Sequence, residues 1–290
     1  MKKQTYLLLV ALSSASLSFG GATSTPKPET FCRFVPERSD DFAWENDKIA
    51  FRAYGPALKA KGEDSGFDCW LKRVEYPIIN KWYKESAEGK SYHKDHGEGY
   101  DPYKVGSSRG CGGLALWIDG NMLISNVFTE WKVVKCETAE SVFVLSYEYK
   151  VGCDIYTEEK KISIKLGDRL FKSTSTFKKN GAIAADLPIA IGLVRHHKTD
   201  LVSKDLSKGW VSIWEPMDDS ELGTGVVIDP KRITDFQLLE TGKNLEDHAL
   251  IITQADAKGQ VEYYAGYGWE KAGEIKTSKE WADYLEAFGK

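Results

Sequence analysis

The sequence has 290 residues, of which 42% are hydrophobic, 12% aromatic and 28% charged. This composition is typical of a globular chain with a substantial core and excludes intrinsic disorder and coiled coil. Lys and Arg total 39 against 43 Asp and Glu, so the net charge of -4 gives no reason to expect nucleic acid as a partner. The 9 Trp and 14 Tyr suit a sheet protein and equally suit a protein that stacks on sugar rings.

Residues 1–22 have the layout of a secretory signal peptide. Lys2 and Lys3 precede an apolar run at 6–17, and small residues follow it. The run is too short for a bilayer span, and no other stretch is long and apolar enough. We therefore expect a periplasmic or secreted protein without a membrane span, whose mature part, 23–290, is a single domain. The sequence does not determine the oligomeric state.

Alternation of apolar and polar residues predicts an all-β fold. Within 161–166, Ile162, Ile164 and Leu166 occupy one face of a strand, and lysines and a serine occupy the other. Further strands are predicted at 48–54, 114–118, 123–128, 131–135, 141–149, 170–177, 189–194, 209–214, 225–228, 249–254 and 262–267. About a dozen strands in one domain indicate a large antiparallel two-sheet sandwich or a closed barrel.

Helical signals are few. Pro77 favours a short helix over 78–85, because proline is tolerated in a first turn. The capping-box pattern from Thr277 to Glu280 predicts a C-terminal helix that presents Trp281 and Leu285 to the sheet as a lid or brace.

Five cysteines are present: Cys32, Cys69, Cys111, Cys136 and Cys153. In an oxidising compartment this number is compatible with one or two disulfides, and the odd count leaves at least one thiol unpaired within the chain. The pairing cannot be deduced from the sequence. Because no C-x-x-C pair occurs, neither a zinc ribbon nor a thioredoxin-type site is indicated.

A long polar loop at 91–113 departs from the strand pattern. It contains six glycines together with His93, Lys94, His96, Tyr100 and Arg109. Loops of this length in compact domains commonly bind or catalyse. Glycine lets backbone approach a ligand, and the titratable side chains supply chemistry. The alternative is a solvated excursion whose side chains bond to its own backbone.

A second cluster, Arg195, His196 and His197, follows the apolar run 187–194. If that run continues as a strand, the two histidines point to opposite faces, so at most one of them lines a given cleft. Each histidine is equally compatible with a structural hydrogen-bonding role.

Known cofactor motifs are absent from the sequence. It has no P-loop, no G-x-G-x-x-G after a strand and no G-x-S-x-G, which disfavours nucleotide cofactors and the usual serine hydrolases. We expect no cofactor. A divalent metal is left open, because His93 and His96 lie three residues apart among Asp95, Glu98 and Asp101, although this spacing is not diagnostic. The paired carboxylates of a glycosidase are also left open.

Four stretches resemble the domain-of-unknown-function family numbered 4861: 34–56, 70–83, 92–106 and the Ser-Arg-Gly-Cys-Gly-Gly of 108–113. The resemblance covers essentially the whole mature chain. It implies a galactose-mutarotase-like supersandwich in an exported bacterial polysaccharide-degrading system. It further implies an oligosaccharide dehydratase of the ulvan-degrading kind, which removes water from a non-reducing terminal glucuronate and leaves a 4,5-unsaturated uronate. The partner is then a uronic-acid oligosaccharide.

Such an elimination needs a base for the C5 proton, a cation on the carboxylate and an acid for the departing C4 hydroxyl. We hypothesise that His96 and Tyr100 transfer protons and that Arg109 binds the carboxylate. Further candidates are His93 and His197 for catalysis, and Lys94, Arg195 and His196 for substrate binding. A glycoside hydrolase or sugar epimerase on the same scaffold, and a non-catalytic carbohydrate-binding module, are the alternatives.

Overall fold

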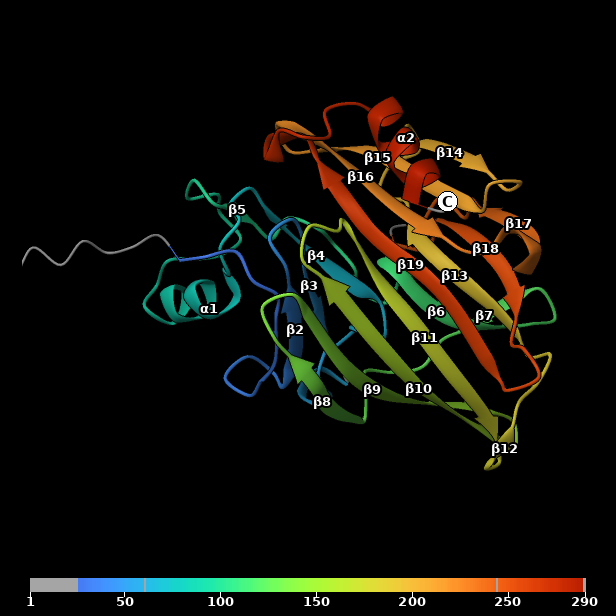
Figure 1. Ribbon diagram of the computed structural model, residues 1–290. Coiled ribbons are helices and arrows are strands. Elements are labelled where there is room, and N and C mark those ends of the chain that lie inside the picture. Colours follow the sequence, from blue (N-terminus) through green and yellow to red (C-terminus); the bar gives the residue numbers. More distant parts are fainter. Residues whose placement is uncertain (1–25, 60, 244, 289–290) are drawn as a thin grey trace, which may run out of the picture.

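The computed structural model describes residues 26–59, 61–243 and 245–288 (Figure 1). The predicted signal peptide at 1–22 lies outside the described residues. Strands account for most of the regular structure, and neighbouring strands of each sheet are antiparallel, which confirms the all-β prediction. In the part of the chain that is described, no helix is long and apolar enough to cross a membrane.

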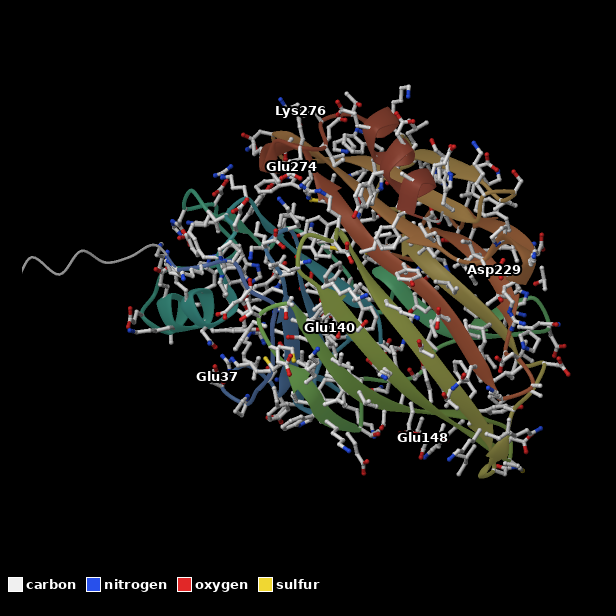
Figure 2. All side chains as sticks on the ribbon, in the orientation of Figure 1. Glu37, Glu140, Glu148, Asp229, Glu274 and Lys276 are labelled. Carbon is white, nitrogen blue, oxygen red and sulfur yellow. The ribbon has the colours of Figure 1, made fainter. Side chains whose placement is uncertain are left out.

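The largest unit is a nine-stranded sheet that faces the viewer in Figure 1. Its outward row is polar, and Glu148 extends away from it in Figure 2. Its inward row carries apolar and aromatic side chains such as Phe143, Ile162 and Phe171, which are fully buried. The strand order is β14 (Leu201–Asp205), β15 (Trp210–Met217), β16 (Ser220–Val227), β19 (Gln260–Trp269), β11 (Leu170–Lys179), β10 (Asp154–Lys165), β9 (Glu140–Val151) and β8 (Glu130–Cys136), with β12 (Ala182–Ile183) paired to β11.

A five-stranded sheet packs behind the nine-stranded sheet (Figure 1). Buried Leu114, Leu116, Ile189 and Ile191 from this sheet belong to the main hydrophobic cluster. The predicted two-sheet sandwich is therefore present, because burying the apolar rows of two antiparallel sheets requires them to face each other. The strand order is β17 (Ile233–Leu239), β18 (His248–Gln254), β13 (Pro188–Val194), β6 (Cys111–Ile118) and β7 (Asn121–Leu123).

A third sheet, which the sequence did not predict as a separate unit, lies beside the sandwich. Helix α1 (Ile79–Ala87) packs on it, with Trp82 stacked on Trp70, as expected for the helix predicted at 78–85. Short 3-10 turns occur at Pro56–Leu58, Pro230–Arg232 and Glu270–Ala272. This N-terminal sheet is made of β1 (Phe31–Val35), β2 (Asp41–Glu45), β3 (Ala50–Ala53), β4 (Phe67–Lys72) and β5 (Gly99–Tyr100).

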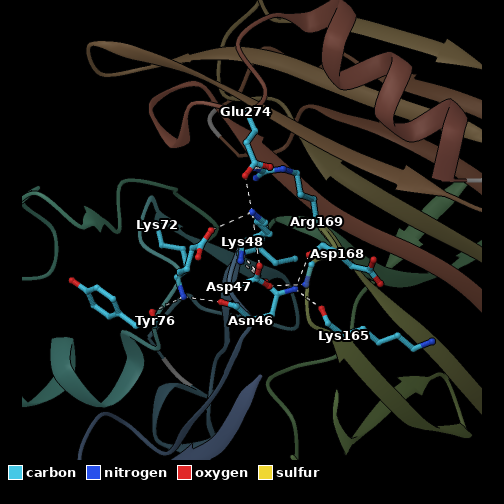
Figure 3. A network of polar contacts seen from close by, with 12 residues as sticks. Asn46, Asp47, Lys48, Lys72, Tyr76, Lys165, Asp168, Arg169 and Glu274 are labelled. Carbon is cyan, nitrogen blue, oxygen red and sulfur yellow. Dashed lines mark hydrogen bonds and ion pairs between the residues drawn. The ribbon is translucent and has the colours of Figure 1, made fainter. Parts of the chain in front are cut away.

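A polar network fixes the N-terminal sheet to the nine-stranded sheet (Figure 3). Asn46 Nδ2 donates to the carbonyl oxygens of Lys165 and Asp168, both at 2.6 Å. Lys48 Nζ lies 2.6 Å from Glu274 Oε1. Because these contacts satisfy backbone groups at the end of β10, the N-terminal sheet is held at a fixed position relative to the sandwich.

The C-terminal helix α2 (Ser278–Phe288) packs on the outer face of the nine-stranded sheet (Figure 1), as predicted. Thr277 Oγ1 accepts from the Glu280 N–H at 3.2 Å, which forms the expected cap. The close approach of α2 to the sheet requires glycine in β16, because a Cβ on Gly223 would lie 2.6 Å from the Trp281 side chain. Trp281 is fully buried and donates to the Thr224 carbonyl at 3.0 Å, so α2 braces this end of the sheet.

Candidate functional site

The two ends of the polar loop at 91–113 have different environments. Arg109 is fully buried, and its guanidinium donates to Ser65 Oγ and to the Leu114 carbonyl, both at 2.9 Å. Burial lowers its pKa. Because protein atoms already take these bonds in the interior, the structure gives Arg109 a structural role instead of the predicted role in binding substrate.

The first half of the loop borders a cavity of about 480 Å³ beside the N-terminal sheet. This is large enough for a sugar unit and falls in the usual range of small-molecule sites. Strand β3 contributes Arg52, the β1–β2 connection contributes Arg38, and the loop contributes His93 and Lys104. The polar residues that line it are Arg38, Arg52, Tyr54, Glu63, His93, Asp101, Tyr103 and Lys104.

Arg52 anchors the cavity wall. Its Nη2 lies 2.5 Å from Asp68 Oδ2 and 3.1 Å from Asp101 Oδ2, and its Nη1 lies 3.8 Å from Asp41 Oδ2. The guanidinium also lies 5.4 Å from the centre of the Trp70 ring. One cation therefore compensates three buried carboxyl groups, and it is held too firmly to exchange them for a substrate carboxylate.

The excess of acidic groups around Arg52 alters their protonation. Burial raises the pKa of Asp41 to about 6. Burial, with the neighbouring Asp68 carboxylate, raises the pKa of Asp101 well above its ordinary value, and the same two causes raise the pKa of Glu63. Perturbed carboxyl groups of this kind gather at functional sites more often than elsewhere.

Two cations on the cavity wall differ from Arg52. Arg38 Nε donates to Tyr92 Oη at 3.0 Å, and its Nη1 donates to Ser39 Oγ at 3.0 Å. Among the described residues, neither Arg38 nor Lys104 forms an ion pair with a carboxylate. Because Arg38 is half-buried and Lys104 is exposed, both can meet an anionic ligand without first breaking an ion pair.

The contacts of His93 set its tautomer. Nδ1 lies 3.0 Å from the Asp101 carbonyl oxygen, which can only accept, so Nδ1 carries the hydrogen. In the neutral ring Nε2 then has a free lone pair. The Asp101 carboxyl Oδ2 also lies 3.4 Å from Nδ1 and helps to hold the ring in this orientation. The side chain is 55% exposed, so a ligand can reach it.

Tyr54 is one of the two phenols that line the cavity, and Tyr103 is the other. Tyr54 is buried, and burial raises its pKa well above the ordinary value, with the Asp68 carboxylate acting in the same direction. Tyr54 therefore keeps its proton at neutral pH and can act as a donor. The Arg52 guanidinium lies 5.2 Å from the centre of its ring and restricts its position.

A second hollow, of about 440 Å³, shares His93 with the first cavity and includes Lys94 and Tyr100. Tyr100 Oη donates to Asp218 Oδ2 at 2.8 Å, and burial together with Asp218 raises its pKa. Its proton is therefore engaged with a carboxylate of the neighbouring hairpin.

His96 lines neither of these two hollows. Its ring nitrogen Nε2 contacts the Ser91 carbonyl at 3.1 Å. In the described part of the chain, no three His, Cys, Asp or Glu side chains gather closely enough to hold a metal ion. The open metal hypothesis at His93 and His96 therefore has no preformed ligand set among these residues.

His196 lies behind the cavity and joins two elements. Nε2 lies 2.7 Å from the Lys104 carbonyl, and Nδ1 lies 2.6 Å from Glu215 Oε2 in β15. Because the Lys104 carbonyl can only accept, Nε2 of His196 carries a hydrogen. The contact between Nδ1 and Glu215 Oε2 then requires a second proton, which these two atoms share. Burial lowers the pKa of His196, but the hydrogen bond to Glu215, the charge of Glu215 and the contact with the Lys104 carbonyl together outweigh it, and the net shift is upward. His196 therefore positions the wall at Lys104 instead of lining the cavity.

The other members of the second cluster point away from this contact. Arg195 Nη1 pairs with Glu240 Oε1 at 2.7 Å, and His197 is exposed. His93 is the one catalytic or substrate-binding candidate that lines the 480 Å³ cavity, and the predicted loop also contributes Asp101, Tyr103 and Lys104 to it. Arg38, Arg52, Tyr54 and Glu63 were not predicted. The detectable signal was Arg52, a charged residue in the otherwise apolar run of β3.

Comparisons with known proteins support a family assignment. The family described as "Domain of unknown function (DUF4861)" matches residues 15–290. A protein of Formosa agariphila with the name "Uncharacterized protein P7" is 35% identical over 281 residues, which is 93% of this chain and 69% of that protein.

Among solved structures, an alpha-galactosidase from Lactobacillus brevis matches with a TM-score of 0.38 and 9% identity. The match covers 87% of this chain but only 42% of the galactosidase chain. A TM-score this low supports no statement about activity.

Proposed function

The chain belongs to the DUF4861 family, and we propose that it is an exported oligosaccharide dehydratase, a carbon–oxygen lyase acting on uronic-acid oligosaccharides. It removes water from a non-reducing terminal glucuronate of the ulvan type and forms a 4,5-unsaturated uronate. The observation that carries the proposal is the cavity, which combines a histidine base with two cations that form no ion pair with a carboxylate of the described residues.

The base in this proposal is His93. Its Nε2 has the free lone pair, because Nδ1 donates to the Asp101 carbonyl. Nε2 removes the C5 proton, and the contact between Nδ1 and the Asp101 carbonyl holds the ring in place. This choice replaces His96, which lines neither hollow.

Arg38 and Lys104 bind the uronate carboxylate. Removing the C5 proton places negative charge on the carboxylate oxygens, and cations near those oxygens stabilise the transition state more than the ground state. A guanidinium binds both oxygens of a carboxylate at once, so Arg38 fixes its orientation. Arg109 is not available for this purpose, because its bonds are made inside the protein.

Tyr54 donates the proton to the departing C4 hydroxyl. The electron pair of the C5–H bond forms the C4–C5 double bond, the C4–O bond breaks, and the hydroxyl leaves as water with the phenol proton. Solvent then carries the proton from His93 back to Tyr54, and the enzyme is restored. The raised pKa of Tyr54 suits a group that must be protonated before each cycle.

A glycoside hydrolase is the second candidate, because Glu63 and Asp101 place two carboxyl groups with raised pKa on the same cavity. A raised pKa is expected of the acid in a glycosidase pair. Arg52 Nη2, however, holds the Asp101 carboxylate at 3.1 Å. Of the two carboxyl groups on this cavity, Glu63 is then the one that forms no ion pair with a described residue.

The test is incubation of the protein with saturated, uronate-terminated oligosaccharides, followed by ultraviolet absorbance and product mass. Dehydration produces a conjugated double bond and the loss of one water without chain cleavage. Chain cleavage with gain of water identifies a hydrolase, and binding with no change of the glycan identifies a binding module. Either of these results would falsify the dehydratase proposal.

A further inference from the structure

The five cysteines form two thiol pairs and one single residue in the tertiary structure. Cys136 Sγ in β8 lies 3.7 Å from the carbonyl oxygen of Cys32 in β1, and the two thiols are neighbours, as are those of Cys69 in β4 and Cys111 in β6. Cys153 is exposed in the turn between β9 and β10. We propose that Cys32 and Cys136 are a disulfide site that links the N-terminal sheet covalently to the nine-stranded sheet.

The first support is the local packing around Cys136. Its Sγ lies 3.7 Å from the Cys32 carbonyl oxygen, and Ser141 Oγ lies 3.7 Å from the same sulfur. The Thr30 N–H donates to the Thr138 carbonyl at 2.9 Å. The start of β1 is therefore held against the β8–β9 hairpin on both sides of the thiols, so their approach does not depend on a mobile segment.

The second support is that no sheet ladder joins these strands. β1 pairs only with β2, and β8 pairs only with β9, within the described sheets. Apart from the Thr30–Thr138 backbone bond, the junction depends on side chains, including Phe34 stacked on Trp131 at 4.9 Å. A covalent bond at this position would therefore stabilise an interface that lacks a sheet ladder.

The two thiols are suited to different steps. Cys136 is exposed, whereas Cys32 is 4% exposed and burial raises its pKa to about 12. Cys136 thiolate attacks a small-molecule disulfide such as oxidised glutathione, and one glutathione thiolate leaves. Cys32 then loses its proton and attacks Cys136 Sγ, and the second glutathione leaves. Two protein thiols are oxidised and one glutathione disulfide is reduced to two thiols.

The buried pair is the contrast within the same chain. Cys69 and Cys111 are both fully buried, and Cys111 Sγ lies 3.3 Å from the Gly266 carbonyl. An oxidant in solution reaches neither thiol in the folded protein. We therefore expect Cys69 and Cys111 to remain reduced under conditions that oxidise Cys32 and Cys136.

The experiment uses the folded full-length protein, equilibrated with oxidised or reduced glutathione and then alkylated under denaturing conditions. Peptide mapping is expected to find Cys32 joined to Cys136, with Cys69 and Cys111 alkylated. The oxidised protein is expected to melt about 5 to 10 °C above the reduced protein. Cys136→Ser is expected to abolish this difference, and the matched exposed variant Cys153→Ser to retain it.

Two results overturn the proposal. One is that all five thiols remain alkylatable after oxidation. The other is that Cys136 ends as a stable mixed disulfide with glutathione, because Cys32 then fails to reach it. The readout is covalent mapping and melting temperature, so it is independent of the proposed dehydratase activity.

Discussion

Two clusters of buried charge in this protein differ in their access to solvent. One surrounds Arg52 and forms the wall of the 480 Å³ cavity. The other lies between the sheets of the sandwich, where Glu158 and Lys160, each 1% exposed, pair at 3.2 Å. Tyr149 and Ser175 donate to the two oxygens of Glu158 at 2.7 and 2.6 Å.

Buried charge alone therefore does not identify a functional site in this protein. The Glu158 cluster is satisfied by protein groups, and burial lowers the pKa of Lys160 in spite of its partner. At the Arg52 cluster, Asp41 Oδ2, Asp68 Oδ1 and Glu63 Oε2 have no hydrogen-bond partner. Incomplete compensation next to a cavity is a better indication of function than burial by itself.

The largest expected effect is a loss of turnover from a substitution at the cavity beside Arg52, with no such loss from a substitution in the Glu158 cluster. His93→Gln is expected to lower dehydratase turnover by about 10²- to 10⁴-fold, because the general base is lost. Glu158→Gln is expected to leave turnover per folded molecule unchanged. Steady-state kinetics with uronate-terminated oligosaccharides measures both variants, with exposed His96→Gln as the matched control in the same loop. Equal losses in His93→Gln and His96→Gln would contradict the assignment of His93.

The second expected effect concerns stability. Arg52→Met leaves Asp41, Asp68 and Asp101 buried without their cation, and is expected to cost about 3 to 5 kcal/mol of unfolding free energy. Urea denaturation measures this loss. The double variant Arg52→Met with Asp68→Asn is expected to recover part of it, because one uncompensated charge is removed. If the double variant is less stable than Arg52→Met, charge compensation is not the function of Arg52.

A third effect is the pH dependence that Asp41 gives the Arg52 cluster. Its folded pKa of about 6 exceeds the ordinary value of 3.8, so ionisation is harder in the folded state. Its contribution to stability is full below pH 3.8 and falls as pH rises to about 6, by about 3 kcal/mol. Asp41→Asn is expected to remove that part of the slope in denaturation measured from pH 4 to 7. An unchanged slope would show that Asp41 ionises normally.

The smallest effect concerns the contact behind the cavity. His196 has a raised pKa, so its contribution to stability is present below its unfolded pKa and is lost as pH rises through the folded value. In the Glu215→Gln variant the side-chain amide can donate to Nδ1 of neutral His196, and Nε2 of His196 still donates to the Lys104 carbonyl. In that variant the loss of unfolding free energy above about pH 6.5 is expected to be smaller by about 1 kcal/mol. A fall that persists in Glu215→Gln would assign it to another group.

Periodicity located most strands of the two large sheets, including the edge strand β8, but missed two other edge strands. The predicted strands at 141–149 and 170–177 correspond to β9 and β11, because each has one buried row. β14 and β17 were missed, since edge strands expose residues such as Leu201 (50%) and Leu238 (40%) and lose the clean alternation. The strand predicted at 123–128 was wrong: β7 ends at Leu123, and the Ser125 carbonyl accepts from Ser65 Oγ at 3.2 Å.

By itself, the sequence determined the all-β class, the capped C-terminal helix and the polar loop at 91–113, because alternation, capping and loop composition are local properties. Only the tertiary structure decided that His93 borders the cavity while Arg109 is buried inside the protein. It alone brought Arg38 and Arg52 to the same wall, and Cys32 to Cys136. The physical reason is that exposure and charge compensation depend on residues far apart in the chain, which meet only when the three sheets pack.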